Sequence, residues 1–292
     1  VTGHGIDPVL RDDLERLSRA FFALPEEEKA RIAMSRAGSA WRGWFPVGGE
    51  LTSGEPDRKE GVYFGTELPA DDPRVVAGTP LHGANLFPEQ PAALRDVVLR
   101  WIDEVAALGA ALLRGLALGL GLDEDWFARA LTADPTILFR AFHYPPGDGD
   151  SWGVGEHTDY GLITLLAQDH HGGLQVRSQG EWIDVPADPY VFVVNIGDML
   201  DRMTRGRYRS DPHRVRNLSG QDRVSFPLFV DPSWDAQVAA LPDSVFEGRA
   251  PDDDAGSRWD GASVHAWEGP YGAYLTAKVA RVFPDLFAGL PG

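Results

Sequence analysis

The sequence predicts a mainly β fold, a sandwich or barrel flanked by α-helices, and three observations support this prediction. From about residue 136 the chain holds short β-prone runs separated by Gly, Pro, Asp and Asn, with no helical pattern between them. The first third and the end of the chain instead carry apolar residues at helical spacing. At 292 residues the chain can bury a sizeable core, and it shows neither an internal repeat nor a second core. We therefore expect a single domain.

The first elements along the chain are predicted helices. In residues 7–24, apolar side chains recur near helical spacing after an Asp-Pro start, and a second helix with an acidic first turn is expected over 25–32. Residues 38–90 are rich in Gly, Pro and aromatic residues and predict loops with short strands. A long helix is expected over about 91–118, ending at a Gly-rich segment, and a short one in 123–131.

The predicted strands follow, and a loop and a helix complete the chain. The acidic run "GRAPDDDAGSRWDGAS" predicts a surface loop, and "YGAYLTAKVARVF" predicts an amphipathic helix. Residues 1–292 thus divide into a largely helical part (about 1–135), a β core (about 136–232) and a C-terminal loop and helix (233–292). The predicted strands of the core are ILFRAFHY, LITLLAQ, GLQVRS, EWIDVP, YVFVVNI, HRVRN and RVSFPLFV.

Composition excludes several classes of function. A net charge of −17 argues against partners that are nucleic acids or anionic membrane surfaces, because their phosphates would be repelled. The absence of cysteine excludes disulfides, thiolate metal sites and cysteine nucleophiles. Arg114 interrupts the most apolar region, which is too short on either side to cross a bilayer. No signal-peptide pattern is present, so we expect a cytoplasmic protein with no obligate protein partner. The opening "VTGHGI" reads as the tail of a strand, so we expect residues to be missing before Val1.

Three residues have the composition of a metal site. His157 and Asp159 lie two positions apart at the start of the apolar run "GLITLL", so on a strand they would project from one face. His213 begins another predicted strand far along the chain. Two histidines and one carboxylate form the 2-His-1-carboxylate triad, which leaves one face of an octahedral Fe(II) ion open. Taken alone, His-x-Asp is a weak signal, because the pair could equally be hydrogen-bonded and close a strand.

A second pair of residues makes the metal interpretation more specific. Arg223 and Ser225 again lie two positions apart, shortly after His213. An arginine that points into a barrel is costly unless it meets an anion, and its planar guanidinium suits a carboxylate. The alternative is that Arg223 pairs with an Asp or Glu of its own acidic chain. Chance explains the combination of all five residues in this order poorly.

The chain also carries a set of longer motifs: VTGHGI, FFALPEEEKARI, RGWFPVGGE, HYPP, GEHTDYGLITLL, GGLQVR, WIDVP, NIGDML, YRSDPHRV, RVSFPLFVDP and YGAYL. Together they resemble, over nearly the whole length, the isopenicillin N synthase-like family of non-haem iron, mostly 2-oxoglutarate-dependent, oxygenases. The resemblance implies a double-stranded β-helix (a cupin-like jelly roll) as the core. That core would bind iron and 2-oxoglutarate.

The resemblance also implies roles for particular residues. The iron ligands of the family fall on His157, Asp159 and His213. Its Arg-x-Ser clamp for 2-oxoglutarate falls on Arg223 and Ser225. The remaining contact to the cosubstrate falls on Tyr144. Two residues before this tyrosine the family commonly has Asn, whereas this chain has Phe142, which removes one polar contact near the iron.

The activity implied is that of an Fe(II)- and 2-oxoglutarate-dependent dioxygenase, an oxidoreductase that oxidises, most often hydroxylates, a small-molecule metabolite. 2-Oxoglutarate and O2 are converted to succinate and CO2. Strand parity places Arg140 and Phe142 on the face of Tyr144, and Phe229 on the face of the Arg-x-Ser pair. These three residues are the candidates for substrate binding. They predict a small, partly apolar organic acid or an aromatic metabolite.

Other functions compete with this one. The synthase itself and the plant ethylene-forming oxidases keep the Arg-x-Ser pair but do not use 2-oxoglutarate as cosubstrate, and a further variant fragments 2-oxoglutarate to ethylene. Two histidines and a carboxylate also suit a zinc hydrolase, although the chain has no His-Glu-x-x-His motif. A β-barrel binding protein without catalysis would leave the five residues unexplained.

Overall fold

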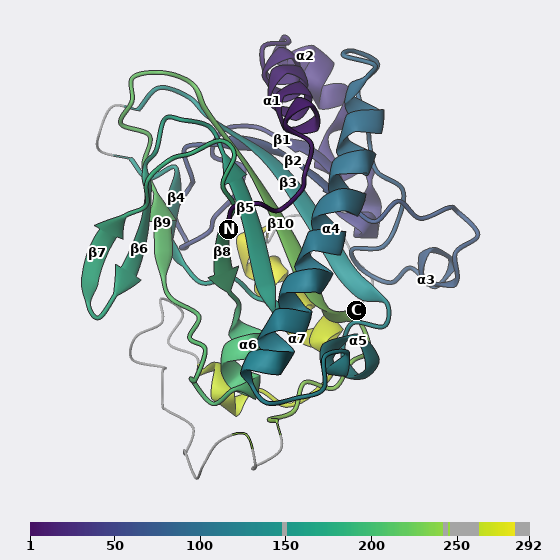
Figure 1. Ribbon diagram of the computed structural model, residues 1–292. Helices are drawn as coiled ribbons and strands as arrows, with labels where there is room; N and C mark the ends of the chain where they lie inside the picture. The colour runs from purple at the N-terminus through teal and green to yellow at the C-terminus, as the bar shows by residue number, and fades with distance from the viewer. Residues whose placement is uncertain (148–150, 242–244, 246–262, 284–292) are drawn as a thin grey trace.

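The computed structural model describes residues 1–147, 151–241, 245 and 263–283, and Figure 1 shows how their elements are arranged. Most of the predicted acidic loop lies outside these residues. Two antiparallel sheets form the core, one with the strand order β1-β2-β3-β10-β5-β8 and one with the order β4-β9-β6-β7. This is the predicted jelly-roll architecture. The strands are β1 Gly43–Phe45, β2 Glu60–Gly65, β3 Pro135–Tyr144, β4 Val154–His157, β5 Ile163–Gln168, β6 Leu174–Ser178, β7 Glu181–Asp184, β8 Val193–Ile196, β9 His213–Val215 and β10 Arg223–Ser233.

Strand β10 organises the larger sheet, because it pairs with β3 on one side and β5 on the other. Its even-numbered residues from 224 to 230 are apolar and buried, whereas the odd-numbered residues from 223 to 231 line a cavity. Arg223 lies opposite Tyr144 in the β10–β3 register, and Ser225 lies opposite Phe142. The period of two along a strand thus brings the polar residues of both strands to one face.

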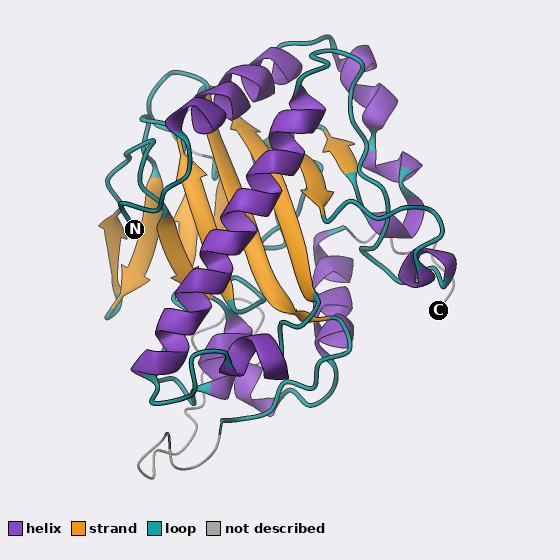
Figure 2. Cartoon of the chain, turned by 45° about the vertical axis from the view of Figure 1, so that its right-hand side comes forward, coloured by secondary structure: helices purple, strands orange, loops and turns teal. Residues whose placement is uncertain are grey.

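Helix α4 (Leu94–Gly119) covers the other face of this sheet, as Figure 2 shows. Gly109 permits the close approach, because a Cβ there would lie 2.6 Å from the Val230 Cγ2 atom of β10. The buried residues of α4 recur at intervals of three to four positions, which is why an amphipathic helix forms here. They are Leu94, Val98, Trp101, Ile102, Val105, Gly109, Leu113 and Ala117.

Helix α7 (Tyr271–Val282) lies on the cavity side, where the predicted amphipathic helix is found. The Tyr271 hydroxyl donates to Asp231 Oδ2 of β10 at 2.5 Å, and the Tyr274 hydroxyl donates to Asp198 Oδ2 at 2.7 Å. Both carboxylates are buried, so these hydrogen bonds satisfy groups that would otherwise be costly to bury. The two tyrosines of the "YGAYL" motif therefore hold α7 on the cavity side through hydrogen bonds to buried carboxyl groups.

The strand region contains one helix that the sequence pattern did not predict. Helix α6 (Asp198–Met203) lies between β8 and β9, so the expectation that no helix separates the strands is wrong at this point. Its first turn carries two acidic residues, which suit the positive end of a helix, and its apolar residues are buried. No helix among the described residues is long and apolar enough to span a bilayer. The other helices are α1 Pro8–Phe22, α2 Glu26–Lys29, α3 Pro73–Val76, α5 Trp126–Ala130 and the 3-10 helices η1 Ala30–Ile32, η2 Met34–Arg36, η3 Gly38–Ala40 and η6 Val264–Ala266.

Candidate metal centre and cosubstrate pocket

One cavity gathers every site residue that the sequence predicted. Its walls come from both sheets, from the loop before β2 and from α7. The predicted residues around it are His157, Asp159, His213, Arg223, Ser225, Tyr144, Arg140, Phe142 and Phe229. The jelly roll thus brings together residues that lie far apart in the sequence.

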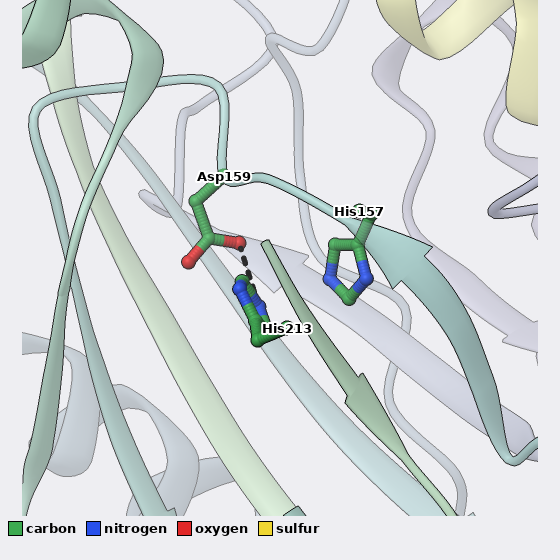
Figure 3. A group of neighbouring side chains, drawn as sticks. All are labelled: His157, Asp159 and His213. Atoms are coloured by element: carbon green, nitrogen blue, oxygen red, sulfur yellow. Dashed lines mark ion pairs between the residues drawn. The ribbon is translucent and has the colours of Figure 1, made fainter. Parts of the chain in front are cut away.

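The three predicted metal ligands converge in the cavity, as Figure 3 shows. His157 is the last residue of β4 and lies directly opposite His213, the first residue of β9. Asp159 lies just beyond the end of β4, in the turn that leads to β5, and not on the strand itself. One nitrogen of each histidine and one oxygen of Asp159 all lie within 4.8 Å of one another. This spacing lets one metal ion contact all three side chains.

Hydrogen bonds orient the two imidazoles. His157 Nδ1 lies 2.8 Å from the Gly155 carbonyl oxygen, which can only accept, so Nδ1 carries the proton and Nε2 is left with a lone pair. His213 Nδ1 lies 3.3 Å from the Asp211 carbonyl oxygen, and its Nε2 lies 3.7 Å from Asp159 Oδ1. In both rings Nε2 is therefore the atom available to a metal.

The protonation states also suit metal binding. Burial and the neighbouring His213 imidazole lower the pKa of His157 to about 3. Burial alone would raise the pKa of Asp159, but the two imidazoles and the Asn195 amide, whose Nδ2 donates to Asp159 Oδ2 at 3.1 Å, outweigh it and lower that pKa. The neutral form of His157 and the ionised form of Asp159 are those that coordinate a divalent metal.

Arg223 is a buried cation with an unused donor. Its Nε donates to the Gly172 carbonyl at 2.6 Å and its Nη2 to Gln168 Oε1 at 3.0 Å, whereas Nη1 has no hydrogen-bond partner within the described residues. The Tyr144 hydroxyl and Ser225 Oγ lie 3.2 Å apart on the same wall. No carboxylate in the described part of the chain forms an ion pair with Arg223, contrary to the alternative of an internal partner. An unpaired guanidinium beside two hydroxyls matches the needs of a ligand carboxylate.

A second arginine, Arg140 of β3, lines the same cavity. The Arg140 guanidinium lies 4.2 Å from the Tyr63 ring centre and 4.6 Å from that of Phe229, within the range of cation–π attraction. Its Nη1 lies 3.7 Å from Glu50 Oε1, too far for a hydrogen bond, and its buried Nε has no partner among the described residues. Phe142 lies on the same wall.

Sequence reasoning missed several residues that line this cavity. Asn195 lies in the motif "NIGDML", which marks the end of β8 but does not reveal that its amide reaches Asp159. Glu50 and Lys59 flank a polar loop, where charged residues are usually exposed, yet both are buried. Tyr160 directly follows Asp159, and Asp231 directly follows the predicted strand RVSFPLFV. Both line the cavity, but no spacing rule identified them as site residues.

Comparisons with known proteins agree with this geometry. Residues 135–232 match the family model of the 2OG-Fe(II) oxygenase superfamily, and residues 1–90 match that of the N-terminal region of the non-haem dioxygenase in morphine synthesis. A Dictyostelium discoideum protein named "Probable iron/ascorbate oxidoreductase" is 49% identical, with 98% of this chain and 85% of the relative covered. The 1-aminocyclopropane-1-carboxylate oxidase of Dictyostelium mucoroides is 35% identical over 98% of this chain and 86% of its own length.

A solved structure shares the fold as well. A full-length Neurospora crassa protein, crystallised in complex with α-ketoglutarate (2-oxoglutarate) and thymine, superposes with a TM-score of 0.76 at 28% identity. The match covers 96% of this chain and 85% of that protein. The cavity also fits the groups that this family uses, because its three ligand atoms converge and Arg223 has a free donor. We conclude that the chain belongs to the 2OG-Fe(II) oxygenase superfamily and is a dioxygenase of that kind, with Fe(II) as its metal and 2-oxoglutarate and O2 as its cosubstrates.

Proposed function

We propose that the protein hydroxylates a small, partly apolar metabolite that carries an acidic group. The observation that carries this proposal is the presence of two arginines in one cavity, the buried Arg223 and the largely buried Arg140, neither of which is fully paired. Arg223 has an unused donor next to Ser225, and Arg140 makes no hydrogen bond to its nearest carboxylate, that of Glu50. One cation is available for the cosubstrate and the other for the substrate.

The proposed roles follow from position. Nε2 of His157, Nε2 of His213 and the carboxylate of Asp159 would hold the iron. When bound, Fe(II) and 2-oxoglutarate would supply the activation of O2, of which one oxygen atom goes to the substrate C–H bond and the other to succinate. The chain itself orients the reactants and keeps water away from the metal.

The cosubstrate end is assigned to the residues around Arg223. The guanidinium would donate through Nη1 to the distal carboxylate of 2-oxoglutarate, and the Ser225 hydroxyl would donate a further hydrogen bond. Tyr144 lies against Arg223, with its ring centre 4.7 Å from the guanidinium carbon, and its hydroxyl completes the polar wall. A guanidinium binds a carboxylate more strongly in such a buried site than in water.

The substrate end is assigned to Arg140, Phe142 and Phe229. The Arg140 guanidinium would bind the acidic group of the substrate, and the two phenylalanines would contact its apolar body. Leu275 and Phe283, from α7 and its end, line the same cavity and would shield the substrate from water. The relative from Neurospora binds thymine, a compact ring, which is consistent with a small substrate.

A second candidate function is an oxidase that does not consume 2-oxoglutarate. The 35% identity to a 1-aminocyclopropane-1-carboxylate oxidase favours it. In that case Arg223 would bind the carboxylate of the substrate and not that of a cosubstrate.

The test is anaerobic reconstitution with Fe(II), followed by a visible absorbance scan on addition of 2-oxoglutarate. We expect a weak metal-to-ligand charge-transfer band that is lost in Arg223→Ala and His213→Ala. Arg42→Ala is the matched control, since Arg42 is equally buried but does not line the cavity. Bound iron without a band in the wild type would overturn the proposed binding of 2-oxoglutarate by Arg223 and favour the oxidase.

The substrate assignment is tested separately, by measuring succinate release with a panel of small aromatic and aliphatic acids. Arg140→Ala should keep the charge-transfer band but raise the KM for the acid that stimulates turnover. Stimulation by neutral analogues to the same degree would contradict the acidic substrate.

A further inference from the structure

The loop between β1 and β2 buries three charged side chains beside the cavity. Lys59 Nζ lies 2.9 Å from Glu50 Oε2 and 2.5 Å from Asp57 Oδ2, and Thr52 donates a hydrogen bond to the same Asp57 oxygen. The three charged residues are at most 3% exposed. Burying charges is costly even when they are paired, so a buried cluster of this kind calls for an explanation beyond stability.

Asp57 has a second contact outside this cluster. Its Oδ1 accepts a hydrogen bond from the Gly155 backbone N–H at 3.1 Å, and the Gly155 carbonyl in turn accepts the proton of His157 Nδ1 at 2.8 Å. A single residue therefore separates Asp57 from an imidazole that faces the metal site. Lys59 and Thr52 hold the other oxygen of the carboxylate.

The geometry of strand β4 explains why the Asp57 side chain, and not a neighbouring strand, accepts the hydrogen bond from the Gly155 N–H group. The β4–β9 register pairs Val154 with Val215 and His157 with His213 but shifts between these two pairs, which marks an irregularity in the segment that holds Gly155 and Glu156. Irregularities such as bulges leave backbone groups without ladder partners and re-aim side chains near active sites. Asp57 supplies the missing acceptor for the Gly155 N–H group.

The packing at Gly155 also shows that the β1–β2 loop lies against β4. A Cβ atom at Gly155 would lie 2.0 Å from Ser53 Oγ, so only glycine allows the loop to sit this close to β4. The loop thus contacts this part of β4 directly. Its Asp57 carboxylate lies next to Gly155, whose carbonyl accepts the hydrogen bond from His157.

We infer that Asp57 is a positioning residue for His157, which it orients through Gly155, with Lys59 holding Asp57 in place. This inference rests on the proposed role of His157 as an iron ligand. Asp57 does not line the cavity, so we expect it to act on the orientation of His157 and not on a bound ligand directly. Removing a direct hydrogen-bond partner of a metal ligand typically changes metal affinity by about 10- to 100-fold, and Asp57 acts one residue further from the ligand.

The experiment measures the affinity of the apo-protein for Fe(II), and for Co(II) by its visible absorbance, under anaerobic conditions. In Asp57→Ala, which loses the acceptor, we expect the affinity to fall by about 10-fold, the lower end of the range for direct partners. Asp57→Asn keeps an oxygen for the Gly155 N–H group and should restore the affinity to within a few-fold of wild type. The Co(II) spectrum of Asp57→Ala should also shift, because a misoriented His157 changes the ligand field.

Lys29→Met is the matched control. It breaks another buried ion pair, between Lys29 Nζ and Glu60 Oε2 at 2.7 Å, which does not line the cavity. Its cost in stability should be similar, with no change in metal affinity. Thermal unfolding of each apo-protein monitors the fold. If Asp57→Ala does not fold, Asp57→Ser replaces it, because a serine hydroxyl fills part of the space but is too short to reach Gly155.

The outcomes separate two kinds of failure. Wild-type metal affinity in a folded Asp57→Ala or Asp57→Ser variant would overturn the positioning role and leave the proposed function intact. An Asp57→Asn variant as impaired as Asp57→Ala would also overturn it, since the acceptor would then not matter. A wild-type protein that binds neither metal would overturn both proposals.

Discussion

Asp231 should make the protein less stable as the pH rises from about 4 to about 8. Its carboxyl group is 2% exposed and lines the cavity. Oδ2 accepts the Tyr271 hydroxyl, whereas Oδ1 packs against Gly161 and has no hydrogen-bond partner among the described residues. Burial raises the pKa of Asp231 from 3.8 to about 7; the Tyr271 hydrogen bond and Arg140 only partly offset this, and Asp159 adds to the rise.

The sign and the size of the effect follow from this pKa. Between pH 3.8 and about pH 7 the folded protein keeps a proton on Asp231 that the unfolded chain has lost. The raised pKa therefore contributes stability that is fully present below about pH 4 and is lost as the pH passes through 7. A difference of about 3 pH units corresponds to about 4 kcal/mol at 1.36 kcal/mol per unit, which is an upper limit for a single group.

The comparison between the wild type and Asp231→Asn isolates this group. The amide is neutral at every pH and can still accept the Tyr271 hydrogen bond, so all other titrating groups cancel in the difference. Urea unfolding of both apo-proteins at pH values from 4 to 8 gives two free energies of unfolding at each pH. Their difference should change in favour of Asp231→Asn by up to about 4 kcal/mol over this range. A difference that stays constant with pH would refute the reasoning.

Three further substitutions test other contacts of the site. Arg223→Met should weaken 2-oxoglutarate binding by about 2–5 kcal/mol, measured by anaerobic calorimetry, because the ligand carboxylate would lose its buried partner; an unchanged Kd would contradict this. Tyr274→Phe should lower the free energy of unfolding by about 1–3 kcal/mol, since a buried carboxylate would lose a 2.7 Å hydrogen bond; equal urea midpoints would speak against it. Gly161→Ala should abolish or sharply reduce folded protein, because the new Cβ would lie 1.5 Å from Asp231 Oδ1. Its control, Gly115→Ala in α4, has nothing within 4 Å and should raise stability by about 0.5–1 kcal/mol in thermal unfolding.

Alternation along the strands explains how much of the site could be predicted from the sequence. Side chains on β3 and β10 switch faces at every residue, so Arg140 and Phe142 had to lie on the cavity side if Tyr144 did. The same rule places Phe229 on the face of β10 that carries Arg223. The helices with a clear apolar stripe, above all α4, were predicted to within a few residues for a similar reason, because the period of 3.6 is local information.

The parts that the sequence did not reveal depend on tertiary packing. Asp57 and Lys59 lie in a polar loop whose composition is that of an exposed segment, and only the contact with the irregular part of β4 shows that they are buried. Asn195 lies near the end of a strand, and its reach to Asp159 depends on how β8 pairs with β5. Charge burial of this kind has no periodic signature, so patterns that reveal strands and helices miss it.

The partners of the three cations that line the cavity, Lys59, Arg140 and Arg223, explain why they should behave differently toward anionic ligands. Lys59 is neutralised by two carboxylates, those of Asp57 and Glu50, so it has little attraction left for a ligand. Arg140 has only a 3.7 Å contact with Glu50 and no hydrogen bond to it. Arg223 forms no ion pair among the described residues, and only neutral groups accept its hydrogen bonds, although the Asp169 carboxylate acts on it electrostatically from a longer distance. Because a buried charge binds an anion more strongly the less it is already compensated, anion affinity should decrease from Arg223 to Arg140 to Lys59. This order agrees with the proposed roles, in which Arg223 binds the cosubstrate, Arg140 binds the substrate and Lys59 supports Asp57.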